Sequence, residues 1–444
     1  MERKVLIIGG GASGMMAAIH AAREGAHVTI LEHMDRVGKK ILSTGNGRCN
    51  LTNLYQGKEC YRSQNEAFPM AVIDQYPVTK VLGFFENLGI LPKSRNGYMY
   101  PNSDQASSVL DVLRSELAHL QVETVCGCSV KKAYFHAGGK KQPVVGVETV
   151  STSSSCTETG KRSAIGADTG KRPAFCVETS LGLFQGDCLI LAAGGKAAPV
   201  TGSDGSGYDL AKGFGHTVIP PLPALVQLRC KEKHYKQLAG IRTEAGITLY
   251  VDGKEKAYET GELQLTDFGI SGIPVFQLSR YASRALYEGR RVTASIDFLP
   301  QKPAEETRAY LQERKISQGY KTAEEWMTGI LNKKLALVLL RLAGIQKEEV
   351  MSGMDDGRME LLLRQIKSYQ TEITAANPFE NAQVCCGGVD TREVNRETME
   401  SRLVPGLYFA GELLDVDGIC GGYNLQWAWS SGALAGIHAG RGQL

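Results

Sequence analysis

The sequence lacks a long run of charge of one sign. Its 444 residues include 50 lysines and arginines against 47 aspartates and glutamates, so the formal net charge is only +3. Proteins that bind nucleic acid or an anionic membrane usually present concentrated basic charge. We therefore expect neither nucleic acid nor a membrane as a partner of this chain.

Long apolar runs and metal-binding cysteine patterns are also missing. The apolar run near the start, Val5–Ile8, is too short for a secretory signal or a membrane span. The eleven cysteines are scattered, and neither Cys126-x-Cys128 nor the Cys385-Cys386 pair has the spacing of a four-ligand zinc site. We expect reduced thiols, no metal and a cytoplasmic location.

A glycine pattern typical of dinucleotide binding stands near the start. The run KVLIIGGGASGMMAAIHAAREGAHVTILE predicts a buried strand, a glycine turn, a helix and a second strand. Gly-x-Gly-x-x-Gly permits a tight turn, close approach to a pyrophosphate and close packing of helix on strand. An acid follows about twenty residues later, where it can accept hydrogen bonds from a ribose. The predicted contacts are Gly9, Gly11, Ala12, Ser13, Gly14 and Glu32.

A polar segment, RVGKKILSTGNGRCNLTN at 36–53, follows that acid directly. It is rich in glycine, cations and amides and has neither helical nor strand periodicity. A surface loop without function would look the same, but a loop at this place would run along the bound dinucleotide. We expect its cations to offset phosphate charge and its amides to bond a polar ring edge. The predicted contacts are Lys40, Gly45, Asn46, Arg48 and Asn50.

Three segments resemble the aminoacetone oxidase-like FAD-binding flavoproteins, a family that includes flavin-dependent 3-dehydro-bile acid reductases of gut bacteria. They are GKKILSTGNGRCNLTN, TGSDGSGYDLAKGFGH at 201–216 and TMESRLVPGLYFAGELLDVDGICGGYNLQWAWSSG at 398–432. The resemblance spans nearly the whole chain. It implies an α/β fold with FAD as the cofactor, bound by a Rossmann-type domain of the two-dinucleotide flavoprotein type that is built from both ends of the chain.

The resemblance also implies cofactor contacts far from the first glycines. In such flavoproteins a late strand ends in Gly-Asp, and the acid bonds the flavin ribitol; here a longer glutamate takes that place. The following glycine pair brings a helix N-terminus to the flavin, where its N–H groups favour the anionic reduced form. Small residues after the strand in LFQGDCLILAAGG can pass beside the adenosine half. The expected contacts are Val130 at the adenine, Gly194, Gly411, Glu412, Gly422, Asn424 and Leu425.

The middle of the chain differs in character from its ends. Residues 216–374 first alternate like β-strands and then show helical periodicity, which predicts a β-rich plus helical domain inserted between 1–215 and 375–444. Such an insertion often forms a lid, because ligand pockets favour domain interfaces. We expect TDFGISG at 266–272 to face the flavin; a plain hairpin turn is the alternative. The polar stretch at about 151–173 is expected to be a local insertion.

No Ser-His-Asp pattern and no His/Cys cluster is visible in the sequence. The flavin supplies the hydride chemistry, so the protein must position a small-molecule substrate and manage protons. The candidate proton donors are Tyr98, Tyr100 and Tyr423. An FAD-dependent reductase of a conjugated enone, such as a 3-oxo bile acid or steroid, is favoured, with NADH or NADPH as transient electron donor. An amine or amino-ketone oxidase and, more remotely, an RNA-related flavin-binding protein are the alternatives.

Overall fold

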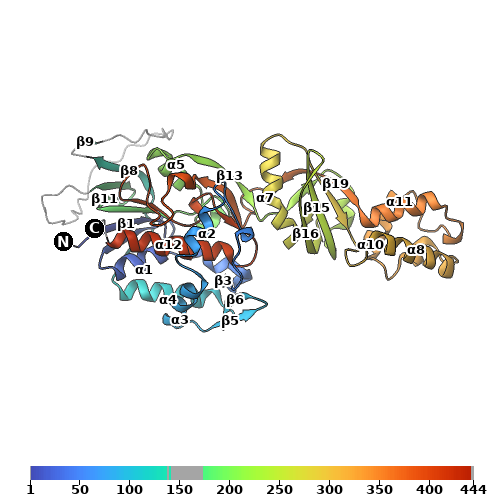
Figure 1. Cartoon of the computed structure of the whole chain (residues 1–444), viewed down its shortest axis with the longest axis horizontal. Helices are drawn as coiled ribbons and strands as arrows, with labels where there is room; N and C mark the ends of the chain where they lie inside the picture. Colours follow the sequence, from blue (N-terminus) through green and yellow to red (C-terminus); the bar gives the residue numbers. More distant parts are fainter. Residues whose placement is uncertain (1, 138–139, 142–173, 442–444) are drawn as a thin grey trace. The chain divides into compact units, whose positions relative to one another are not determined.

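The structure is a computed structural model and describes residues 2–137, 140–141 and 174–441. The insertion predicted at about 151–173 lies outside the described residues. Figure 1 shows helices and strands along the chain, from β1 in blue to α12 in red. Among the described residues, no helix has the length and apolar composition that crossing a membrane requires.

The chain divides into two compact units. The first contains Met1–Pro221 and Gly387–Leu444, and the second contains Leu222–Cys386. The sequence predicted an inserted domain at 216–374. The second unit begins and ends later in the chain than this prediction. The role of the second unit as a lid stays a prediction.

The later return to the first unit has a local cause. The last barrel strand, β19 (Tyr369–Ala376), is followed by backbone bonds from Asn377 N–H to Gln227 O (2.9 Å) and from Gln383 N–H to Leu225 O (3.4 Å). These bonds hold residues 377–383 to the second unit, beyond the boundary at 374 that the sequence predicted. The chain passes from the first unit to the second within β13 (Val218–Ala224) and returns within β20 (Val384–Val389). These two strands pair with each other.

A five-stranded sheet forms the centre of the first unit, in the order β21-β12-β1-β2-β7. All neighbouring strands in it are parallel. The β1 sequence KVLII is buried at every position except its first, as expected for a parallel strand that is covered on both faces. The strands are β1 (Lys4–Ile8), β2 (His27–Leu31), β7 (Glu123–Val125), β12 (Cys188–Leu191) and β21 (Leu407–Phe409).

Two helices from distant parts of the sequence pack together in the first unit: α1 (Ala12–Arg23) and α12 (Tyr423–Arg441). Figure 1 shows the red α12 beside the blue α1. Three α12 glycines recur at four-residue spacing, which places them on one helix face. A Cβ on any of them would lie within 2.9 Å of an α1 backbone oxygen; the pairs are Gly432 with Ser13, Gly436 with Ala17 and Gly440 with Ala21. Glycine therefore sets how closely the two helices approach.

Smaller elements surround this central layer. The strand β3, which lies in the predicted polar segment, forms a three-stranded sheet with two later strands in the order β3-β6-β5. Four other strands form a sheet in the order β11-β10-β8-β9. The helices are α2 (Phe68–Ile73), α3 (Val78–Asn87), α4 (Ala106–His119), α5 (Ser206–Gly213) and the 3-10 helix η1 (Lys39–Gly47). The strands are β3 (Thr52–Asn53), β4 (Tyr61–Arg62), β5 (Pro92–Arg95), β6 (Tyr98–Pro101), β8 (Val130–Ala137), β9 (Lys140–Lys141), β10 (Phe175–Thr179), β11 (Gly182–Gly186), β13 (Val218–Ala224), β20 (Val384–Val389) and β22 (Asp417–Gly418).

The second unit is a closed barrel with helices, in the strand order β14-β17-β16-β15-β18-β19. Burial alternates along β18, as it must when one face of a strand lines a barrel interior. The strands are β14 (Leu228–Cys230), β15 (Arg242–Val251), β16 (Lys254–Leu265), β17 (Gly269–Ser271), β18 (Val292–Asp297) and β19. The helices are α6 (Tyr235–Leu238), α7 (Ile273–Tyr287), α8 (Ala304–Gln318), α9 (Ala323–Met327), α10 (Lys333–Leu342) and α11 (Asp356–Lys367).

Candidate dinucleotide site

Of the three glycines of the Gly-x-Gly-x-x-Gly pattern after β1, two are crowded and one is open. Gly9 has φ +101°, and a Cβ there would lie 2.5 Å from Ala192 O; a Cβ at Gly14 would overlap Gly9 O. At Gly11, by contrast, no heavy atom of the described residues lies within 4 Å of such a Cβ. The first helical bond of α1 runs from Met15 N–H to Gly11 O. The N–H groups of the first turn, at Ala12, Ser13 and Gly14, are therefore available to a ligand. Open space beside such donors fits a pyrophosphate.

Glu32 follows β2 and is only 7% exposed. Its Oε2 accepts from Gly10 N–H (2.7 Å) and its Oε1 accepts from Met34 N–H (2.8 Å). Each carboxylate oxygen has a further lone pair, so the acid can also accept from a ribose. Cys128 N–H donates to Glu32 O (2.9 Å), which brings the chain just before Val130 beside this acid.

An ion pair joins two residues that the sequence assigned to different parts of the cofactor. Lys40 Nζ lies 2.8 Å from Glu412 Oε2 and also donates to Ala197 O (3.2 Å). The sequence placed Lys40 near phosphate and Glu412 near the ribitol. The structure pairs the two with each other, and a third donor of the ammonium group is left for a ligand.

Gly411 lies against the start of α1. It has φ +75°, and a Cβ there would overlap the side chain of Ser13. Its N–H donates to Ser431 Oγ (2.9 Å), and its carbonyl accepts from Trp427 Nε1 (3.0 Å), so α12 fixes this turn. Gly194, the small residue expected after β12, also has a left-handed φ of +75°.

The polar segment expected to lack regular structure forms η1, interrupted by a turn. Gly45 (φ +57°) and Asn46 (φ +55°) are left-handed, and the side chains of Asn46 and Arg48 are exposed. A Cβ at Gly45 would lie 2.8 Å from Asn50 N and 3.5 Å from Tyr100 Cε1. The turn therefore folds back onto Asn50 and Tyr100.

Asn50 carries a buried acceptor beside the start of α12. The residue is 8% exposed, and its Oδ1 has no hydrogen-bond partner within the described part of the chain. A Cβ at Gly422 would lie 2.9 Å from this Oδ1 and 2.7 Å from the carbonyl carbon of Thr52. Leaving a buried acceptor unpaired costs about 1–3 kcal/mol. The residues present therefore fit a bound group that supplies a hydrogen-bond donor here, as FAD does.

The start of α12 presents unbonded N–H groups, because its first helical bond runs from Gln426 N–H to Gly422 O (2.9 Å). The Asn424 side chain closes the preceding turn, since its Oδ1 accepts from Gly418 N–H (2.8 Å) and its Nδ2 donates to Gly418 O (2.9 Å). The backbone N–H groups of Asn424 and Leu425 lie in the first turn, where the sequence predicted contacts to the flavin.

Two of the three candidate tyrosines flank one glycine. A Cβ at Gly421 would lie 2.8 Å from Tyr98 Cε1 and 3.2 Å from Tyr423 Cε2, whereas Tyr100 lies at Gly45. Tyr98 is 39% exposed and Tyr423 only 5%. Burial, together with the neighbouring Cys60 thiol, raises the pKa of Tyr423 well above its usual value, so its hydroxyl stays protonated.

A buried chain of polar side chains, which no sequence pattern predicted, supports this region. Thr52 Oγ1 donates to Gln426 Oε1 (2.6 Å), and Gln426 Nε2 donates to Ser430 Oγ (2.9 Å) and to Tyr76 O (3.3 Å). These bonds hold β3 against α12 beside Gly422. The available signal was a lone glutamine within the apolar run NLQWAW.

A serine, a histidine and a glutamate also meet in the first unit. His216 Nε2 lies 2.7 Å from Ser401 Oγ, and His216 Nδ1 lies 3.0 Å from Glu393 Oε2. The serine Oγ accepts from Leu403 N–H (3.0 Å) and Val404 N–H (2.9 Å), so its lone pairs are occupied. This cluster stabilises a loop and is not a nucleophile. No sequence pattern indicates this cluster, because its members are far apart in the chain. Within the described residues, no group of His, Cys, Asp or Glu side chains could hold a metal ion.

Comparison with known families decides the relationship. The family described as HI0933-like protein Rossmann domain matches residues 3–173 and 152–438. The chain belongs to this family. The predicted Rossmann-type FAD-binding domain and flavoprotein family are thereby confirmed, and the chain is an oxidoreductase.

Relatives of this family member include two kinds of enzyme. The chain is 45% identical to a 3-dehydro-bile acid delta(4,6)-reductase of Clostridium scindens over 435 residues, which cover 98% of each chain. It is 29% identical to a ribosomal RNA dihydrouridine synthase of Haemophilus influenzae over 438 residues, again 98% of each chain. Among solved structures, a 3-ketosteroid delta1-dehydrogenase from Sterolibacterium denitrificans matches with a TM-score of 0.46, 12% identity and 99% of each chain covered. That structural likeness is too weak to support a conclusion about activity.

Proposed function

We propose that this chain is an FAD-dependent reductase of a C=C bond conjugated to a carbonyl group, as in a 3-oxo bile acid or a steroid-like enone. The observation that carries the proposal is the 45% identity to the Clostridium scindens bile acid reductase over 98% of both chains. The match leaves no domain of either protein unpaired, so a shared substrate class is the simplest interpretation.

The start of α12 supports this chemistry. FAD supplies hydride transfer when it is bound, and its reduced form carries negative charge. The first turn of α12 offers N–H groups at Asn424 and Leu425 together with the positive end of the helix dipole. These groups would stabilise that charge without a titrating side chain.

A conjugated substrate needs a hydrogen-bond or proton donor for its developing enolate. Tyr98 and Tyr423 lie together at Gly421, and Tyr98 has the more exposed side chain, so it is the first candidate to reach a substrate. Tyr423 and Tyr100 are the other two. Single Tyr→Phe variants distinguish them, because loss of the donor should lower kcat while FAD content is retained.

We propose NADH or NADPH as the transient electron donor. The sequence carries one dinucleotide fingerprint, at 9–14, and FAD uses it. The nicotinamide and the enone should therefore react in turn, which gives ping-pong kinetics. A cytoplasmic location belongs to the same proposal and is supported by the odd number of cysteines, eleven, which fits reduced thiols.

Two alternatives use the same cofactor site. An amine or amino-ketone oxidase would pass electrons from its substrate to oxygen. An RNA-modifying flavoprotein is suggested by the ribosomal RNA dihydrouridine synthases of Haemophilus influenzae and Escherichia coli, which are 29% and 28% identical to this chain. The net charge of +3 disfavours a large RNA interface.

Anaerobic stopped-flow spectroscopy separates these functions. The flavin is reduced with NADH or NADPH and then mixed with a 3-oxo-4-ene bile acid or steroid, with oxygen or with RNA. Rapid reoxidation by the enone is expected. Reduction only by amines with reoxidation only by oxygen would favour the oxidase, and turnover only with RNA would favour the RNA-modifying enzyme.

A further inference from the structure

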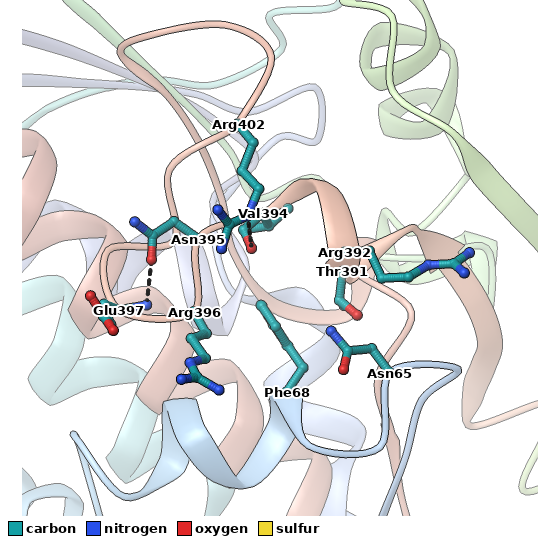
Figure 2. A pocket seen from close by; sticks show the side chains of 9 residues that line it. All are labelled: Asn65, Phe68, Thr391, Arg392, Val394, Asn395, Arg396, Glu397 and Arg402. Carbon is teal, nitrogen blue, oxygen red and sulfur yellow. Dashed lines mark hydrogen bonds between the residues drawn. The ribbon is translucent and has the colours of Figure 1, made fainter.

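The first unit contains a polar pocket outside the dinucleotide site. Its volume is about 360 Å³, and three arginines line it: Arg392, Arg396 and Arg402. Figure 2 shows Arg396 and Arg402 on one side of Phe68 and the Asn65 amide, the Thr391 hydroxyl and Arg392 on the other, with the Arg392 guanidinium directed away from the other two arginines. The arginine, asparagine and threonine side chains can all donate hydrogen bonds, so the pocket presents donors to its contents.

A short hairpin holds the arginines in place. Arg402 N–H donates to Glu393 O (2.8 Å), and Asn395 N–H donates to Glu400 O (2.8 Å). Gln75 Nε2 donates to Arg396 O (2.9 Å), which ties the tip of the hairpin to the loop after α2. The backbone that presents these arginines is therefore fixed before any ligand binds, which reduces the entropic cost of binding.

The three arginines are exposed, and their charge is only partly compensated. Arg392 makes a bidentate ion pair with Asp390, in which Nε donates to Oδ1 (2.9 Å) and Nη2 to Oδ2 (2.5 Å). Arg402 uses its Nε toward Val394 O (3.4 Å). The Arg396 guanidinium makes no hydrogen bond or ion pair with any residue that the structure describes. Glu397 is the one acid that lines the pocket among these residues, so the lining carries net positive charge.

We propose that this pocket binds a small phosphate-bearing anion, such as pyrophosphate or an organic monophosphate. Guanidinium groups match phosphate oxygens in pairs and remain charged at every physiological pH. The neutral donors of Asn65 and Thr391 complete the recognition of a tetrahedral oxyanion. The volume lies at the lower end of the range for small-molecule sites, about 300–1,000 Å³, which selects a compact occupant over a nucleic acid chain.

Calorimetric titration of the FAD-saturated protein tests the site. Inorganic pyrophosphate, inorganic phosphate and a nucleoside monophosphate are titrated separately at about 0.15 M salt, where nonspecific surface attraction is largely screened. Saturable binding of one pyrophosphate per chain is expected, and Arg396→Gln should weaken it about tenfold or more. Arg364→Gln removes the same charge from a side chain that is 68% exposed on α11, so it should leave binding unchanged.

Three results would overturn the proposal. They are the absence of saturable binding, an equal loss of affinity in both variants, and binding of an RNA oligonucleotide but of none of the small anions. Flavin absorbance is followed in the same samples, since release of FAD during titration would mean that the anion occupies the dinucleotide site instead. If Arg396→Gln lowers the FAD content, Arg402→Gln replaces it with the same expected loss of pyrophosphate affinity.

Discussion

Glu32 shows how a single buried side chain can connect fold and cofactor. Its carboxylate already receives two backbone N–H groups, from Gly10 and Met34, which fix both the glycine turn and the exit of β2. A ribose hydroxyl would be a further partner. The same acid therefore positions the glycine turn and is predicted to bind the adjacent sugar, so we expect its loss to affect FAD more than it affects the fold.

We predict that Glu32→Ala raises the dissociation constant of FAD by about 10- to 100-fold, since hydrogen bonds to charged groups contribute about 1.5–3 kcal/mol each. Fluorescence titration of the apoprotein with FAD measures this, and circular dichroism checks the fold. Glu66→Ala, at an exposed position before α2, is the control and should bind FAD normally. Unchanged FAD affinity in Glu32→Ala would remove Glu32 from the site.

His20 on α1 is a residue whose effect depends on pH. Burial lowers its pKa from 6.5 to about 4, with Arg23 adding to the shift and Glu24 opposing it. Its ring lies 3.1 Å from the Tyr76 hydroxyl and stacks on Phe84. In the unfolded chain the imidazole takes up a proton as pH falls through about 6.5, but in the folded protein only near 4. Folded stability is therefore fully present above pH 6.5 and is lost as pH falls toward 4.

We expect His20→Gln to flatten the decline in the free energy of unfolding between pH 6.5 and pH 4, by up to about 3 kcal/mol at the acidic end. Urea denaturation at a series of pH values measures the slope. The exposed His119→Gln variant should follow the original protein. Equal slopes for His20→Gln and the original protein would show that His20 takes up its proton at the same pH in the folded and unfolded chains.

Sequence patterns indicate single residues where the spacing is local, and they do not indicate contacts that depend on distant partners; the contacts of the predicted site residues with FAD stay predictions. The glycine turn and Glu32 could be placed because their spacing is local. The pairing of Lys40 with Glu412 could not, because each residue is compatible with a ligand contact on its own and only the fold brings them to 2.8 Å. The unpartnered Asn50 acceptor also depends on where Gly422 lies in space.

At the scale of elements, the contact between α1 and α12 determines the geometry around the turn after β1. Each α12 glycine faces an α1 carbonyl, and Gly436 faces that of Ala17 most tightly. Strands and helices of the first unit were predictable from apolar runs and glycines. The run at 322–345 shows amphipathic helical periodicity, yet the structure breaks it at Gly329 (φ +85°), and Asn332 caps a second helix by accepting from Lys334 N–H. Local backbone chemistry overrides periodicity there.

We predict that Gly436→Ala destabilises the protein by about 1–3 kcal/mol, because its methyl group would overlap Ala17 O and over-packing has that cost. Chemical denaturation with FAD bound measures the change. Gly83→Ala in α3 is the matched control, since no heavy atom lies within 4 Å of its Cβ position. Helix propensity alone should make that variant stabler by up to about 1 kcal/mol. Stabilisation by both changes would refute the close-packing account.

The whole molecule has two separate hydrophobic cores. The second core uses residues between Leu228 and Ile373, and the first uses residues from both flanking parts of the chain, including Val5 and Ala439. The barrel closes on itself, so its strands have no unpaired edge between neighbours. The sequence could predict a separate inserted domain, but strand order and barrel closure depend on long-range pairing, which local patterns do not encode.

We expect residues 222–386, produced alone, to fold into a monomer with a cooperative thermal transition, because the fragment carries a complete core and a closed barrel. Calorimetry and heteronuclear NMR measure this. The N-terminal fragment 1–221 should not fold or bind FAD, since it lacks β21 and α12 of the first unit. A disordered 222–386 fragment would show that its core needs the first unit.

The discontinuity of the first unit also imposes an order on biosynthesis. Between β12 and its neighbour β21 the ribosome must make more than 200 residues, which takes roughly 10–40 s at about 5–20 residues per second. During that interval the nascent chain exposes the unpaired backbone edge of β12 and the small-residue face of α1, while the barrel can already fold. Because the predicted flavin contacts at Asn424 and Leu425 lie in α12, we expect FAD to bind only after α12 has been translated. Chaperones that shield apolar nascent segments are expected to remain bound through this interval. They are expected to dissociate when α12 packs against α1 and completes the core of the first unit.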